Sequence, residues 1–76
     1  MPMAFVLINS ETGAEDTVIR ALKKIEAVKE TYKVYGVHDI VAKVEADTMD
    51  ELEKAITWRI RRVDKIQTTQ TMIVSK

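Results

Sequence analysis

The sequence predicts an α+β fold in the order βαββαβ, with a four-stranded antiparallel sheet and two helices on one of its faces. Two observations predict it. Four short apolar or alternating segments and two amphipathic segments of helical period follow one another in that order. The two halves of the chain also resemble each other, because each amphipathic segment opens with Thr followed three residues later by Glu, at Thr12 and Glu15 and again at Thr48 and Glu51.

The first half contains one strand and one helix. Met3 to Ile8 ("MAFVLI") is a short run that is apolar on both faces, which is typical of a buried central strand. The helix is expected after the capping box of Thr12 and Glu15. Its buried stripe has the spacing i, i+4, i+7 and comprises Val18, Leu22 and Ile25.

A pair of strands follows. Val28 to Gly36 alternates as a half-exposed edge strand does, and this alternation predicts that Val28 and Tyr32 share a face. Residues 39–46 ("DIVAKVEA") form a more apolar strand, and the bend between the two strands falls at Gly36 to Asp39. Ile40, Ala42 and Val44 are expected on one face of the second strand.

The second half repeats the pattern. A capping box at Thr48 and Glu51 opens a helix over residues 48–63. Its stripe comprises Leu52, Ile56, Ile60 and Val63. The last strand is expected at Lys65 to Val74, and its polar, threonine-rich centre is typical of an edge.

This order predicts a ferredoxin-like split β-α-β sandwich in which right-handed crossovers place the first and third strands in the centre. The helices cover only one face, yet Met3, Phe5 and Leu7 would face the other. An apolar face of this kind usually marks an interface. We therefore expect a homodimer that packs its sheets as a dimeric α+β barrel, with two-fold symmetry.

The composition and charge of the chain limit the classes of function that it can have. The 76 residues form a single domain (1–76), and 12 basic residues balance 12 acidic ones, which gives no electrostatic footprint for nucleic acid. There is no cysteine, a secretory leader is not visible, and no apolar stretch approaches the roughly 20 residues of a membrane span. We expect a cytoplasmic protein without a metal site or cofactor.

The segment "YGVHDIV", residues 35–41, combines Gly36, His38 and Asp39 between apolar runs, and three interpretations fit it. Gly36 can simply form the hairpin turn. His38 and Asp39 can form a general acid–base pair, although neighbours on a strand point to opposite faces. Alternatively, backbone N–H groups near Gly36 bind a carboxylate while Asp39 binds an ammonium, which suits a zwitterion.

Two other features carry polar or aromatic groups. The threonines of the last strand, which include Thr69 and Thr71, can line a polar pocket or can reflect the propensity of an edge strand. Trp58 lies off the apolar stripe of its helix. It either packs at the edge of the core, which we prefer, or covers a partner subunit.

Nearly the whole chain resembles the effector domain of the Lrp/AsnC family of leucine-responsive, feast/famine transcription regulators, called RAM. The resemblance rests on V-x-x-x-Y-x-V-x-G-x-x-D, residues 28–39, and on the closing T-x-T-x-I-V, residues 69–74. It implies dimers that assemble into rings, with small effectors, usually amino acids, bound between dimers and no catalysis. Carried over by motif position, the ligand-binding residues are Gly36, His38 and Asp39, with Ile40, Thr69 and Thr71 as further candidates.

The chain also departs from the family pattern. Family regulators carry an N-terminal helix-turn-helix domain, whereas the first strand here starts at Met3. We therefore expect a stand-alone version of the domain, which does not itself bind DNA but senses an effector or co-assembles with full-length regulators. Two alternatives remain open: a small dimeric α+β-barrel enzyme of monooxygenase or isomerase type that uses His38, and a structural or ACT-type oligomer.

Overall fold

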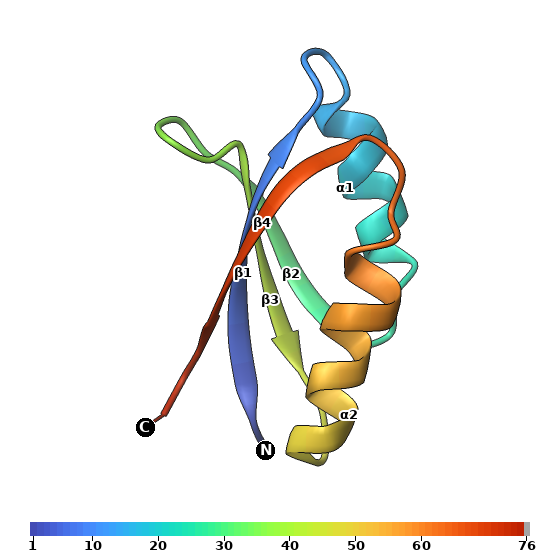
Figure 1. Cartoon of the computed structure of the whole chain (residues 1–76), viewed down its shortest axis with the longest axis vertical. Coiled ribbons are helices and arrows are strands. Elements are labelled where there is room, and N and C mark those ends of the chain that lie inside the picture. Colours follow the sequence, from blue (N-terminus) through green and yellow to red (C-terminus); the bar gives the residue numbers. More distant parts are fainter. Residues whose placement is uncertain (76) are drawn as a thin grey trace.

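The computed structural model describes residues 1–75 of the chain and has the predicted order of elements (Figure 1). The elements are β1 (Met3–Ser10), α1 (Glu15–Lys23), β2 (Val28–Lys33), β3 (Ile40–Glu45), α2 (Met49–Lys54), the π-helical turn η1 (Ala55–Ile60) and β4 (Ile66–Ile73).

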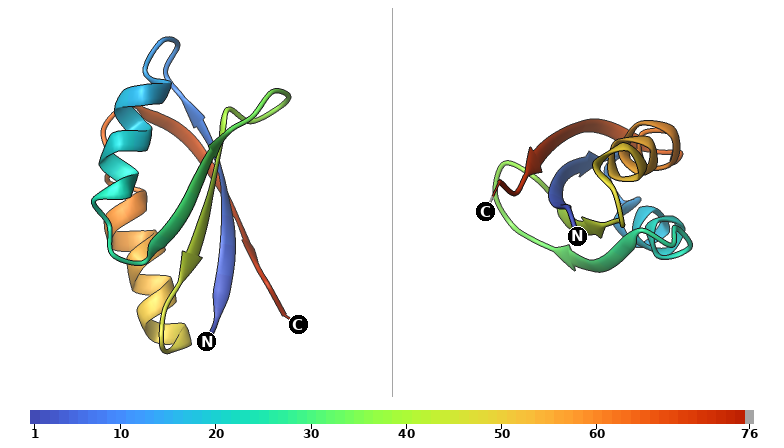
Figure 2. Two further views of the ribbon diagram at one scale, coloured as in Figure 1. Left: turned by 180° about the vertical axis from the view of Figure 1, so that it is seen from behind. Right: turned by 90° about the horizontal axis from the view of Figure 1, so that it is seen from below.

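The strands form one antiparallel sheet in the order β2-β3-β1-β4. The two most apolar strands, β1 and β3, are therefore central, and β2 and β4 are the edges, as predicted. Both helices lie against the same face of the sheet, which Figure 2 shows from behind and from below. The ferredoxin-like topology is thus confirmed.

The core lies between that face and the helices. β1 contributes Ala4, Val6 and Ile8, all with 0% exposure. The predicted stripes contribute Val18, Leu22, Leu52, Ile56 and Ile60 from the helices and Ile25 from the turn that follows α1. Val63, the last residue of the second stripe, is only partly buried and packs against the cluster from outside.

The two sequence-predicted capping boxes behave differently. Thr48 caps α2, and its Oγ1 accepts a hydrogen bond from the N–H of Glu51 at 3.1 Å. The first prediction is wrong, because α1 starts at Glu15 after Ala14, without a side-chain cap. Gly13, with φ +81°, turns the chain into the helix one residue after Thr12, which separates the threonine from the cap position.

The alternation predicted for the first hairpin strand is also wrong. The register shifts between Val28 and Glu30, so that Val28 pairs with Val44 while Tyr32 pairs with Val41. Paired residues share a face, and Val44 faces the helices. A β-bulge therefore places Val28 and Tyr32 on opposite faces of the sheet.

The second face of the sheet carries no helix, and we call it the open face. Its apolar half lies on the central strand β1 and the edge strand β4, where Met3, Phe5 and Leu7 are half-buried and Met72 is 47% exposed. The half over β2 and β3 is mainly polar, with Glu30, Tyr32, Lys43 and Glu45, and Val41 is its apolar member next to Leu7.

Candidate functional site

The connection between β2 and β3, residues 34–39, is the candidate site, and we call it the hairpin loop. The N–H of Val34 donates to the carbonyl of Asp39 at 2.8 Å and closes the loop. Gly36 has φ +135°, a conformation that favours glycine. The loop extends beyond the sheet on the side away from the helices (Figures 1 and 2). The side chains of Tyr35 and Val37 flank Gly36 and are 106% and 84% exposed.

Four successive backbone donors in this loop are free. Within residues 1–75, the N–H groups of residues 35–38 donate to no protein acceptor. Consecutive unpaired N–H groups in a turn form a concave surface that suits an anion. A carboxylate is therefore the kind of group that this backbone can hold.

The end of β1 fixes the base of the loop through Asp39. The N–H of Asp39 donates to the carbonyl of Ile8 at 2.9 Å. In return, one carboxylate oxygen of Asp39, Oδ2, accepts the N–H of Ser10 at 3.1 Å and faces the Ser10 hydroxyl at 3.4 Å. Asp39 thus anchors the loop with Oδ2, and Oδ1 has no partner within the described chain.

Asn9 holds the middle of the loop. Its Nδ2 donates to the carbonyl of Val37 at 2.7 Å, and its Oδ1 lies 2.5 Å from Nδ1 of His38. His38 is half-buried. One amide side chain therefore connects the strand to two successive loop residues.

These hydrogen bonds argue against one of the three interpretations of residues 35–41, the general acid–base pair. His38 bonds to Asn9, whereas Asp39 bonds to Ser10, so within residues 1–75 the two side chains form no acid–base pair. The structure keeps Gly36, His38 and Asp39 together on one loop. Sequence reasoning missed Asn9 and Ser10 as partners of this loop. The available signal was the abrupt change from the apolar run to two polar residues at the end of the first strand.

The other predicted site residues lie elsewhere in the single chain. Ile40 is fully buried in the core. Thr69 and Thr71 pair with Ile8 and Val6, so they face the helices rather than the open face. The hydroxyl of Thr71 is buried and has no hydrogen-bond partner within the described residues.

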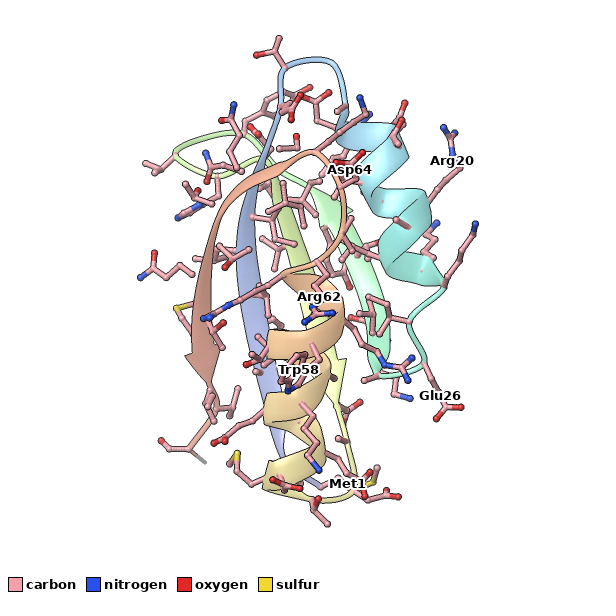
Figure 3. All side chains as sticks on the ribbon, turned by 45° about the vertical axis from the view of Figure 1, so that its right-hand side comes forward. Met1, Arg20, Glu26, Trp58, Arg62 and Asp64 are labelled. Carbon is pink, nitrogen blue, oxygen red and sulfur yellow. The ribbon has the colours of Figure 1, made fainter. Side chains whose placement is uncertain are left out.

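A groove of about 520 Å³ lies at the far end of the molecule, between the end of α1, the end of β3 and the second helix. Trp58 forms one wall of this groove and is 58% exposed. The prediction that its side chain packs at the edge of the core is therefore wrong. The Arg62 guanidinium stacks on the indole 4.6 Å from its centroid, and Figure 3 shows the two side chains together on the outer face. A smaller cavity beside β2 also lies away from the hairpin loop.

No cluster of three histidine, cysteine, aspartate or glutamate side chains that would hold a metal ion occurs within residues 1–75. None of the described helices combines the length and apolar character that crossing a membrane requires.

The chain matches the model of the Lrp/AsnC ligand binding domain over residues 3–76. It is 32% identical over 73 residues to an uncharacterized HTH-type transcriptional regulator of Pyrococcus abyssi, covering 96% of this chain and 46% of the regulator. The chain thus spans about half the length of that relative.

Two solved structures of similar size match closely. The crystal structure of FFRP-DM1 is 43% identical, with a TM-score of 0.92, and the match covers 97% of this chain and 99% of the other. A hypothetical protein from Pyrococcus horikoshii is 42% identical, with a TM-score of 0.92 and coverage of 100% and 92%. Since the family model matches almost every residue, the chain belongs to the Lrp/AsnC family and corresponds to its ligand-binding domain.

Proposed function

We propose that residues 1–76 form a single amino acid-binding and assembly domain, in which the hairpin loop holds the effector and the open face holds a second copy of the chain. The free N–H groups of residues 35–38 carry this proposal. They lie on the loop that also contributes Asp39 and His38, in a chain whose family model is a ligand-binding domain.

The chemistry of the loop suits both ends of an amino acid. The free N–H groups offer hydrogen bonds to the carboxylate. Oδ1 of Asp39 is available for the ammonium in a charge-assisted hydrogen bond, because only Oδ2 is used to anchor the loop. Ile40, Thr69 and Thr71 remain predicted ligand contacts.

A neighbouring copy would complete the site. Neither of the two cavities described above lies at the hairpin loop, and Tyr35 and Val37 are exposed on its surface. A ligand on this loop therefore lacks walls until another subunit supplies them. A dimer formed through the open faces, assembled further into a ring, brings such loops against other copies.

The regulatory role follows from this assembly. Relatives twice as long are named transcriptional regulators, and this chain matches one half of them. We propose that the domain acts in the cytoplasm by co-assembly with such regulators, so that effector binding alters their association without direct DNA contact. We assign no catalytic role to His38, since its partner is an amide.

Calorimetric titration with the twenty standard L-amino acids tests the proposal, and thermal shifts provide an independent readout. We expect at least one amino acid to bind, and we expect Asp39→Asn to weaken it by roughly tenfold through loss of a charge-assisted hydrogen bond. Asp47→Asn, an exposed aspartate after β3, is the matched control and should bind normally. Absence of binding at millimolar concentration by all twenty would refute the effector role.

A further inference from the structure

The hydrogen bonds of Asn9 define which nitrogen of His38 carries the proton. The carbonyl of Val37 can only accept, so the amide group facing it is Nδ2, and Oδ1 necessarily faces the imidazole. Oδ1 can also only accept. Nδ1 of His38 must therefore carry a hydrogen, and the neutral ring is held as the Nδ1–H tautomer.

The opposite nitrogen is then an acceptor. Within residues 1–75, Nε2 of His38 makes no hydrogen bond. In the neutral ring it presents a lone pair to a ligand. Protonation therefore changes Nε2 from a hydrogen-bond acceptor to a donor, while the hydrogen bond between Nδ1 and Asn9 is kept.

We propose that Asn9 is a positioning residue that fixes His38 as the Nδ1–H tautomer, so that Nε2 accepts a hydrogen bond from the ammonium group of the bound amino acid. This inference rests on the proposed function. Nε2 would thus share the ammonium with Oδ1 of Asp39, while the backbone N–H groups hold the carboxylate. Asn9 acts only through His38 and the loop and needs no contact with the ligand.

Nitrogen-15 NMR of the full chain tests the positioning without any ligand. The wild-type protein should show His38 with the proton on Nδ1 at pH 8. Asn9→Ala should release the ring to a mixture or to the Nε2–H form. Asn9→Asp keeps an acceptor at this position and should retain the Nδ1–H tautomer. A wild-type His38 protonated mainly on Nε2 would overturn the proposal.

Titration with the L-amino acid panel tests the ligand contact. For any member that binds, Asn9→Ala should weaken binding by roughly tenfold at pH 8, the equivalent of one hydrogen bond. Asn9→Asp, which keeps the acceptor for His38 Nδ1, should bind the amino acid more tightly than Asn9→Ala. Thr57→Ala, an exposed position on η1, is the control and should match the wild type.

The two proposals fail in different ways. If no amino acid binds, the effector role and the ammonium contact are both wrong, and the NMR result still decides whether Asn9 sets the tautomer. If amino acids bind but Asn9→Ala leaves both the affinity and the His38 tautomer unchanged, the effector role stands and the role assigned to Asn9 and His38 is wrong.

Discussion

The two faces of β1 carry similar side chains in different environments. Ala4, Val6 and Ile8 face the helices and are completely buried, whereas Met3, Phe5 and Leu7 alternate with them on the open face and are only half-buried. Apolar character alone therefore does not tell which face a chain covers with its own helices. The difference separates the face that stabilises the subunit from the face that we propose for assembly.

The largest expected difference between the two faces of β1 is the loss of stability when neighbouring residues are truncated to alanine. Ile8→Ala removes a fully buried side chain and leaves a cavity, so it should lower the free energy of unfolding by about 2–5 kcal/mol. Leu7→Ala, one residue earlier, should lower the free energy of unfolding clearly less when the subunits are not associated. Urea unfolding measured at low protein concentration compares the two.

Raising the protein concentration completes the comparison. Stability that comes from association depends on concentration, whereas stability from the core does not. The deficit of Leu7→Ala should therefore increase with concentration, and that of Ile8→Ala should not. Equal deficits at every concentration would show that the open face contributes nothing to assembly.

A charge on the open face should have the next largest effect. Leu7→Asp would place an unpaired carboxylate inside the proposed sheet-to-sheet interface, at a cost of several kcal/mol that corresponds to a roughly hundredfold or greater loss of dimer affinity. Sedimentation velocity should show a lighter species, and the far-ultraviolet circular dichroism should stay unchanged. Gln70→Asp, at the paired position on β4, serves as a milder control because that residue is already polar and exposed.

The fold was predictable from the sequence because its signals are local and repeated. The i, i+4 stripes and the apolar run of β1 define the elements, and the crossover rule then places β1 and β3 in the centre. The bulge near Lys29 was not predictable, since the sequence there contains neither glycine nor proline. The π-helical turn likewise follows α2 without a sequence signal that we can identify.

The candidate site was predictable only in part. Gly36, His38 and Asp39 are contiguous, so sequence alone groups them. Their partners Asn9 and Ser10 lie 29 residues away, in hydrogen bonds that exist only after β1 and β3 have paired. The sequence could therefore suggest a His–Asp pair, whereas the three-dimensional pairing gives each of these residues a different partner.

The two Thr-x-x-Glu motifs allow a matched test of smaller size. Thr48→Ala should reduce the free energy of unfolding by about 1 kcal/mol, because the N–H of Glu51 loses its acceptor. Thr12→Ala should change the free energy of unfolding by only a few tenths of the Thr48→Ala effect, since Thr12 does not cap α1. Thermal and urea unfolding compare the variants. Equal losses would mean that Thr12 caps the helix in solution.

The smallest expected effect concerns an exposed ion pair that joins α1 to β2. Nζ of Lys33 donates to Oδ1 of Asp16 at 3.0 Å, and this hydrogen bond lowers the pKa of Asp16 and raises the pKa of Lys33. The aspartate contribution to stability is therefore present above its unfolded-state pKa and is lost as pH falls through its folded-state pKa. The lysine contribution is present below its unfolded-state pKa and is lost as pH rises through its raised folded-state pKa.

Carboxyl-detected NMR titration measures this effect directly. In the wild type Asp16 should titrate below the ordinary aspartate range, and Lys33→Gln should return its pKa toward that range. Lys54→Gln, which breaks the separate Lys54–Asp50 pair of α2, should leave Asp16 unchanged. Because both Asp16 and Lys33 are exposed to solvent, molar salt should screen the pair and reproduce much of the Lys33→Gln result. A salt-independent Asp16 pKa in the ordinary range would show that this contact does not persist in solution.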